Sequence, residues 1–332
     1  MEKQTKKRIL VTGNRGFIGW NFTQYLFSKS SEVEFVLGVD KISEVSIKDP
    51  IWPVLPYKFV KGHTSNTELM RFLLEEYSIT DCVDFAASSH VDESIKNPDI
   101  FFEDNIRGTY GLVKAALDYQ KNVNNNFRYL KTSTDEVFGT LNINDEPFTE
   151  QSQYRPSNPY SSSKAAGDHI VYSFYKTFGL NAIITHSCNN YGPLQDVTKM
   201  TSKTIVNAIQ GKDVIIYGKG EEMRQWIFID DSCSAIWFVL NNGKCGENYN
   251  IGDIEELKNI ELVHMILNIL KTKYKIDAFN QIKFVENRLS HDFRYRLDFG
   301  KLVSLGWQPK YSFNEGLEKT VEWYYNRYNK KQ

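Results

Sequence analysis

Apolar and polar residues alternate in a regular order over the first 190 residues of the chain. Short runs rich in β-branched residues have the continuous apolar character of strands buried on both faces, at 8–12, 34–39, 82–85, 127–132 and 182–185. Apolar residues at helical spacing lie between these runs, at 21–27, 67–77, 98–119 and 159–178. Strands that alternate with helices predict a Rossmann-type, doubly wound parallel sheet of the α/β class.

The alternation loosens after Gly192 and Pro193. Helical spacing continues at 201–210, 231–240, 259–271 and 314–325, whereas strand-like runs occupy only 214–217 and 226–229. We therefore expect two units. They are a larger domain at 1–190, to which 226–250 returns, and a smaller α+β lobe at 191–225 and 251–332.

The helix expected at 159–178 is apolar on more than one face, through Ile170, Val171, Phe174, Tyr175 and Phe178. A helix that is apolar nearly all round must be covered by something further. A second copy of the chain fits this requirement, so we expect a homodimer.

Composition narrows the class of protein. Of the 332 residues 41% are hydrophobic and the net charge is -1, so we expect a globular protein without a nucleic-acid partner. No apolar run approaches a membrane span, and residues 1–8 lack the apolar core of a secretory signal. The four cysteines form no Cys-x-x-Cys pair, which indicates reduced thiols and a cytoplasmic location. We assign no residue to a metal.

Three glycines, Gly13, Gly16 and Gly19, separate the first expected strand from the first helix. This arrangement is typical of dinucleotide binding, because the glycines allow a tight turn and close approach of the backbone to a pyrophosphate at the helix N-terminus. Asp40 ends the second strand, where a carboxylate binds ribose hydroxyls and repels a 2′-phosphate, which favours NAD over NADP. Arg15 could pair with that phosphate instead, or it could be a solvated loop residue.

Residues 86–90, after the third strand, are mostly small and would let a cofactor lie close to the backbone. His90 could contact cofactor or substrate, although a structural histidine is at least as well supported. The residues expected to bind the cofactor are Gly13, Arg15, Gly16, Phe17, Ile18, Gly19, Asp40, Ala86, Ser88, Asn105, Tyr160 and Lys164.

The expected catalytic groups follow the fourth strand and open the long helix. Tyr160 and Lys164 are four residues apart on that helix, so they share a face, and a nearby ammonium would lower the pKa of the phenol. Asp135 and Glu136 follow Thr134 at the carboxyl edge of the sheet, where two adjacent carboxyls separate into an acid and a base. The simpler alternative is that Asp135 caps a turn and Glu136 is solvated.

With these residues the chain resembles an extended short-chain dehydrogenase/reductase, and specifically the nucleoside-diphosphate-glucose 4,6-dehydratases. The resemblance covers nearly the whole length, and the Thr-Asp-Glu triplet is its most specific part. The matching segments are 11–19, 89–92, 133–137, 160–164, 189–193, 217–220, 249–252 and 288–292.

The resemblance implies a composite reaction on a nucleoside-diphosphate glucose, with the larger domain holding NAD and the smaller lobe the sugar nucleotide. Tyr160, with Thr134, would take the C4 hydroxyl proton while hydride passes to NAD. Glu136 would take the C5 proton, and Asp135 would protonate the C6 hydroxyl, which departs as water. Hydride would then return to C6, and C5 would be reprotonated. The resemblance also suggests substrate contacts at His90, Asn189, Asn190, Tyr217, Arg224, Asn259 and Arg288.

The chain departs from the family pattern at three places, which are Phe138, His63-Thr64 at the expected adenine contact, and the loop 194–200 with Thr198. The loop leaves both dTDP-glucose and UDP-glucose open as substrates. A sugar-nucleotide 4-epimerase is the alternative function, since it would use Thr134, Tyr160, Lys164 and NAD without the acid pair. A non-catalytic regulator on the same fold has no reason to keep all five groups.

Overall fold

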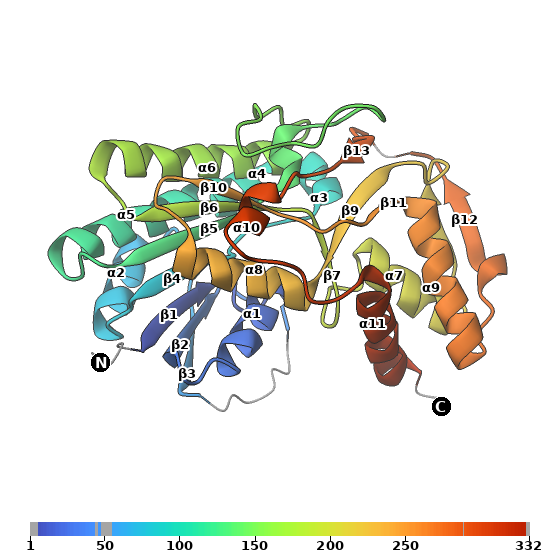
Figure 1. The fold of residues 1–332 in the computed structure, drawn as a ribbon, viewed down its shortest axis with the longest axis horizontal. Helices are drawn as coiled ribbons and strands as arrows, with labels where there is room; N and C mark the ends of the chain where they lie inside the picture. Colours follow the sequence, from blue (N-terminus) through green and yellow to red (C-terminus); the bar gives the residue numbers. More distant parts are fainter. Residues whose placement is uncertain (1–5, 44–45, 48–54, 288, 330–332) are drawn as a thin grey trace.

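Seven parallel strands form the central sheet of the computed structural model, which describes residues 6–43, 46–47, 55–287 and 289–329 (Figure 1). Their order is β10-β6-β5-β4-β1-β2-β3. The strands are β1 (Lys7–Thr12), β2 (Val33–Asp40), β3 (Tyr57–Lys61), β4 (Asp81–Asp84), β5 (Arg128–Thr134), β6 (Ala182–Ser187) and β10 (Asn248–Ile251). The order reverses between β1 and β4, so their carboxyl ends diverge at the position where such sheets bind ligands.

Helices cover both faces of this sheet. One face carries α2 (Thr67–Glu76), α5 (Gly108–Asn122) and α6 (Pro159–Phe178), and the other carries α1 (Phe17–Phe27) and α8 (Ile229–Asn242) (Figure 1). Strand β1 shows why its sequence is continuously apolar. Ile9 and Val11 join the core on one side of the sheet, and Leu10 joins the core on the other.

The doubly wound sheet expected from the sequence is confirmed, but two of its strands were not predicted. Strand β3 lies at one edge beside β2, and β10 lies at the other edge beside β6. Helix α8 packs beside α1 and leads into β10, which pairs with β6.

The helix expected at 98–119 has a different internal structure. It consists of α4 (Pro98–Phe102), a π-helical turn η1 (Glu103–Arg107) and α5. The π turn buries Asp104 and Asn105, and turns of this type frequently occur at functional sites. A short helix, α3 (Val91–Lys96), precedes α4 and was also not predicted.

The smaller lobe lies at the right of Figure 1 and packs three helices beside short strands. The helices are α7 (Met200–Ile209), α9 (Asn259–Tyr274) and α11 (Phe313–Tyr328). Strands β7 (Asn189–Tyr191), β9 (Met223–Phe228), β11 (Glu256–Lys258) and β13 (Arg294–Tyr295) form one sheet, and β8 (Val214–Tyr217) pairs with β12 (Ile282–Val285). The remaining short helices are η2 (Asp135–Phe138), η3 (Phe279–Gln281) and α10 (Gly300–Ser304).

All four cysteines are free thiols, and only Cys245 is exposed. Within the described ranges, no helix has both the length and the apolar composition needed to cross a membrane.

Candidate active site

The turn between β1 and α1 is tightly packed at its glycines. Gly13 has a φ of +61°, and a Cβ there would lie 2.7 Å from the backbone of Phe85. A Cβ on Gly19 would lie 2.3 Å from the carbonyl oxygen of Gly13. Side chains are therefore excluded at both positions, as the expected dinucleotide-binding turn requires.

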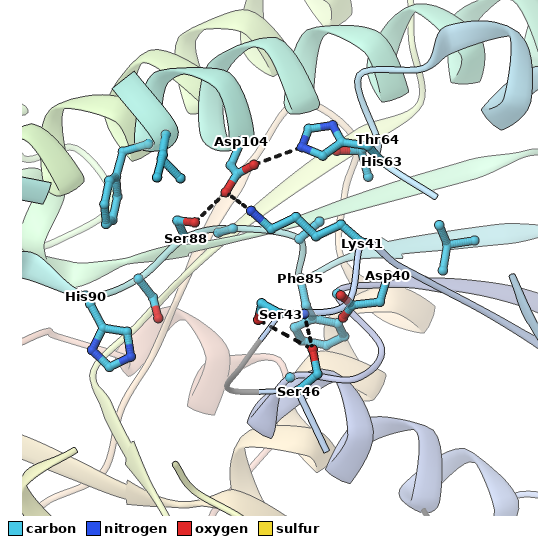
Figure 2. Close-up of a pocket in the computed structure, with 18 of the residues that line it drawn as sticks. Asp40, Lys41, Ser43, Ser46, His63, Thr64, Phe85, Ser88, His90 and Asp104 are labelled. Atoms are coloured by element: carbon cyan, nitrogen blue, oxygen red, sulfur yellow. Dashed lines mark hydrogen bonds and ion pairs between the residues drawn. The ribbon is translucent and has the colours of Figure 1, made fainter. Parts of the chain in front are cut away.

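A cavity of about 460 Å³ opens beside this turn (Figure 2). It is lined by Gly13, Gly16, Asp40, Ala86 and Ser88, all of which were expected to bind the cofactor. The carboxylate of Asp40 accepts hydrogen bonds from the backbone N–H groups of Arg15 and Ile42, both at 2.9 Å. These bonds fix the carboxylate at the end of β2, where an adenosine ribose would lie.

Arg15 does not line this cavity. Its guanidinium carbon lies 4.5 Å from the ring centre of Phe59 and 5.6 Å from that of Trp20. A guanidinium nitrogen donates to the carbonyl oxygen of Ile47 at 3.4 Å. The side chain thus packs on aromatic rings, and the expectation that it contacts the cofactor receives no support from its position.

The opposite wall of the cavity contains a buried carboxylate, Asp104, from the π turn (Figure 2). One oxygen binds His63 Nε2 at 2.8 Å, and the other accepts from Lys41 Nζ and from the Ser88 hydroxyl. Burial alone would raise the pKa of Asp104, but the hydrogen bonds from His63, Lys41 and Ser88 outweigh it and lower that pKa to about 2. Asp104 is therefore ionised at neutral pH.

Asn105 was expected to contact the cofactor, but it does not line this cavity. Its amide binds both the N–H and the carbonyl oxygen of Ser88, at 2.9 and 3.0 Å, and donates to the Ser163 hydroxyl at 2.8 Å. Asn105 therefore supports the cavity wall from behind.

A second cavity, of about 300 Å³, brings the five expected catalytic residues together. Its lining includes Thr134, Asp135, Glu136, Tyr160 and Lys164, from the end of β5, the turn η2 and the start of α6. Gly13, Gly16, Phe17, Ile18 and Gly19 line the same cavity. The catalytic groups and the dinucleotide turn therefore face one space.

Local sequence explains how these groups are held. The Thr134 hydroxyl accepts from the N–H of Glu136 at 3.3 Å and so caps the turn η2. Asn158 caps α6 through a capping box with Ser161, which fixes the first turn that carries Tyr160. The acid pair and the tyrosine are thus set by helix termini.

Asp135 and Glu136 differ strongly in environment. Asp135 is 1% exposed, and its Oδ2 has no hydrogen-bond partner, whereas Glu136 is half-buried. Burial and the adjacent charge of Glu136 raise the pKa of Asp135 from 3.8 to about 7. Near neutral pH Asp135 can therefore carry a proton beside a second, less buried carboxyl group, a difference that suits separate acid and base roles.

The Tyr160–Lys164 pair differs from the expectation. Burial and the charge of Glu136 raise the pKa of the Tyr160 phenol, and only a hydrogen bond with Thr134 opposes them. Lys164 Nζ donates to the carbonyl oxygen of Thr132 at 2.8 Å. Burial and the charge of Lys131 lower the pKa of Lys164 from 10.5 to about 7. The protein groups alone therefore do not produce the expected lowering of the tyrosine pKa.

A buried polar network lies behind this pair. Asp168, one helical turn after Lys164, accepts from the Ser133 hydroxyl at 2.6 Å and from Tyr154 at 3.3 Å. His186 Nε2 lies 3.5 Å from the same carboxylate, and β5–β6 register places His186 beside Ser133. Burial would raise the pKa of Asp168, but His186 and the nearby lysines lower it. Sequence inspection missed this network because no motif joins its members.

A third cavity, of about 250 Å³, continues into the smaller lobe. Its lining includes the expected substrate residues His90, Asn189, Tyr217, Arg224 and Asn259, together with Glu136. Asn190 lines the catalytic cavity instead, and Arg288 lies outside the described residues.

The side chains of two of these residues already contact other groups of the protein. The Arg224 guanidinium donates to the carbonyl oxygens of Asp292, Met223 and Phe293, and it lies 4.2 Å from the ring centre of Tyr295. His90 lies where the three cavities meet, 3.4 Å from the Thr198 hydroxyl, and burial and Lys199 lower its pKa.

The departures from the family pattern lie in distinct places. Phe138 is buried and stacks on Phe148 with ring centres 5.2 Å apart. His63 and Thr64 line the dinucleotide cavity, and Thr198 lines the cavity of the smaller lobe.

Comparison with known proteins agrees with this arrangement. Residues 10–320 match the family model described as GDP-mannose 4,6 dehydratase. A dTDP-glucose 4,6-dehydratase of Haemophilus influenzae is 39% identical over 333 residues, covering 95% of this chain and 97% of that protein. The low-salt glycan biosynthesis protein Agl12 of Haloferax volcanii is 40% identical over 319 residues, covering 95% of this chain and 98% of that protein.

Among solved structures, DesIV of Streptomyces venezuelae, a dTDP-glucose 4,6-dehydratase with NAD and TYD bound, superposes with a TM-score of 0.86. The two chains are 35% identical, over 96% of this chain and 97% of DesIV. A dTDP-glucose 4,6-dehydratase of Bacillus anthracis in complex with NAD gives the same TM-score and identity, with the same coverage of both chains.

Proposed function

Because this chain belongs to the family of sugar-nucleotide 4,6-dehydratases, we propose that it converts dTDP-glucose or UDP-glucose into the 4-keto-6-deoxy sugar nucleotide and water. NAD is its cofactor. The glycine turn, which no Cβ would fit, and the Asp40 carboxylate suit a dinucleotide with an unmodified ribose. When bound, NAD supplies the acceptor for the C4 hydride and the donor that returns it to C6.

We assign the proton transfers to the residues of the catalytic cavity. Tyr160 takes the C4 hydroxyl proton, and Thr134 lines the same cavity. Since the C4 ketone acidifies the C5 hydrogen, Glu136 can remove it as a proton, while Asp135 gives a proton to the C6 hydroxyl, which departs as water. C5 regains a proton when hydride returns to C6. Lys164 supports the phenolate only as a cation, so its charge state should limit the first step.

One observation supports the dehydratase over the alternative epimerase most directly. Asp135, with a pKa of about 7, lies beside Glu136 in the cavity that also holds Tyr160 and Lys164. An epimerase transfers hydride at C4 and returns it there, so it needs no buried acid beside a base. Elimination of water across C5 and C6 needs both.

The test is the fate of hydrogen at C4. The protein is incubated with NAD and dTDP-glucose deuterated at C4, and the product is analysed by mass spectrometry and NMR. A dehydratase places the deuterium on C6 of a keto product, and this product absorbs ultraviolet light in alkali. An epimer with deuterium still on C4 would contradict the proposal.

The double variant Asp135→Asn/Glu136→Gln completes this test. It should abolish formation of the keto product, because both proton-transfer groups are lost. An epimerase would keep its activity, because it does not use the acid pair. Parallel incubations with dTDP-, UDP-, GDP- and CDP-glucose identify the nucleotide.

We further propose a homodimer that forms through α5 and α6. Aromatic side chains remain exposed there in the single chain, with Tyr110 at 48%, Tyr172 at 47% and Phe178 at 47%. Burial of such rings is a strong source of association energy. The free thiols support a reducing compartment such as the cytoplasm.

A further inference from the structure

The cavity wall around Asp104 joins four separate segments of the larger domain (Figure 2). Asp104 belongs to the π turn, Lys41 follows β2, His63 follows β3 and Ser88 follows β4. All four residues line the cavity of about 460 Å³ that contains Asp40 and the glycine turn. The carboxylate is therefore the common acceptor for three donors at the dinucleotide site.

The hydrogen bonds of Asp104 also define the form of His63. An ionised carboxylate can only accept, so the hydrogen must lie on His63 Nε2. Nδ1 accepts from the Ser65 N–H at 3.1 Å. Hydrogen bonds at both ring nitrogens thus hold His63 in one orientation.

Lys41 is well placed to bind the 2′-phosphate of NADP. It directly follows Asp40, and dinucleotide sites that accept NADP place a cation close to that position. In this chain the Lys41 ammonium is directed to Asp104, which is 8% exposed at its side chain. The other nearby cation, Arg15, lies against Phe59 and outside the cavity.

Resting on the proposed function, we propose that Asp104 is a specificity-determining residue that selects NAD over NADP by binding Lys41. Its carboxylate pairs with the ammonium that would otherwise bind a 2′-phosphate and so adds to the repulsion from Asp40. The selection thus depends on two carboxylates on opposite walls, one at the end of β2 and one in the π turn.

The experiment measures binding rather than turnover. Full-length protein depleted of dinucleotide is titrated calorimetrically with NAD and with NADP, for the unchanged chain and for Asp104→Asn. Release of Lys41 should improve NADP affinity relative to NAD by about tenfold, because one charge-assisted contact to phosphate becomes available. The preference for NAD over NADP should become smaller but should not reverse, because the Asp40 carboxylate remains.

Two further variants assign the effect to Lys41. In Asp104→Asn/Lys41→Met the gain in relative NADP affinity should disappear. Glu103→Gln is the matched control, because it removes the same charge from the same turn at an exposed site paired with Arg107. An equal gain in Glu103→Gln, or a gain that persists without Lys41, would overturn the proposal.

Lys41→Met alone keeps the inference testable if Asp104→Asn does not fold. The ratio of the two affinities should then stay within about twofold of the unchanged chain, because Asp104 already neutralises the ammonium. A large loss of NADP affinity would mean that Lys41 binds phosphate despite Asp104, and would refute the role. Failure of the unchanged chain to bind either dinucleotide would instead refute the proposed function.

Discussion

Asp135 is a buried carboxyl that is placed for chemistry at a cost to stability. Its Oδ2 lacks a hydrogen-bond partner, and its neighbour along the chain is a second acid. Its pKa is about 7 in the folded protein, against 3.8 for an ordinary aspartate. The folded state therefore binds this proton more tightly than the unfolded state, so the contribution of Asp135 to stability falls as the pH rises from about 4 to about 7.

Asp135→Asn should be more stable than the unchanged chain at neutral and alkaline pH. The gain in free energy of unfolding should grow by about 2–3 kcal/mol between pH 5 and pH 8, because the amide has no charge to desolvate. Urea unfolding at the two pH values measures it. The exposed Asp213→Asn is the control, and an equal growth of stability with pH in both variants would contradict the argument.

Turnover should decline above about pH 7. Asp135 loses its acidic proton there, and Lys164, with a pKa also near 7, loses its charge. The variant Lys131→Met separates the contributions of Asp135 and Lys164 to this decline, because removing the Lys131 charge raises the pKa of Lys164. If the decline in kcat moves to higher pH, Lys164 controls it. An unchanged profile assigns it to Asp135, and a profile flat to pH 9 in both proteins would contradict both assignments.

Single residues were predictable where a local pattern carries the chemistry. The Thr-Asp-Glu triplet, the Tyr160–Lys164 spacing and the glycine turn are short motifs, and the structure places them around one cavity. Asp104 carries no such pattern. Its partners lie 16 to 63 positions away, so only the folded chain identifies it.

At the scale of elements, α6 joins catalysis to the core. Tyr160, Lys164 and Asp168 recur every four residues, so they lie along one face of the helix. Asp168 is 1% exposed and is held by side chains of β5, β6 and the loop before α6. This face of α6 is therefore fixed against the sheet by polar contacts as well as by apolar packing.

Asp168→Asn should destabilise the protein and change its pH profile. Loss of the buried charge leaves Asp84 as the remaining carboxylate near Lys131 and Lys164, at a cost of about 3 kcal/mol. It also lowers the pKa of Lys164 further, so kcat should decline at lower pH than in the unchanged chain. Chemical unfolding and a pH–rate profile measure the two effects.

Ser133→Ala is the graded companion to this variant. It removes one of the hydrogen bonds to Asp168 but keeps the charge, so it should cost about 1 kcal/mol and leave the pH profile in place. If the pH–rate profile shifted as far as in Asp168→Asn, the pKa of Lys164 would depend on packing around Asp168 rather than on its charge.

Most elements were predictable because their periodicity is strong, and the exceptions have physical reasons. Strand β10 contains Asn248 and Asn250, so it lacks the apolar run by which the other strands were found. The side chain of Asn250 is buried and binds the carbonyl oxygens of Phe148 and Asp298. The π turn cannot be read from spacing, since it changes the helical register by a single residue within one continuous helix.

At the scale of the whole molecule, the exposed aromatic face of α5 and α6 predicts self-association. Phe178→Glu combined with Tyr172→Glu should shift the protein from dimer to monomer, because two charges would have to be buried in the interface. Light scattering coupled to size-exclusion chromatography measures the mass. Phe284→Glu, at an exposed apolar site of the smaller lobe, should leave the mass unchanged. A monomeric unchanged chain would contradict the dimer.

The position of β10 at the sheet edge bears on how the protein is made. The chain leaves the larger domain after β6, builds β7, α7, β8 and β9, and only then supplies α8 and β10. A nascent chain on the ribosome thus cannot close the edge of β6 until residue 251 has been translated and released from the exit tunnel. The two lobes are spatially distinct but are not separable products of synthesis, because the first is completed by residues that are translated after the second has begun.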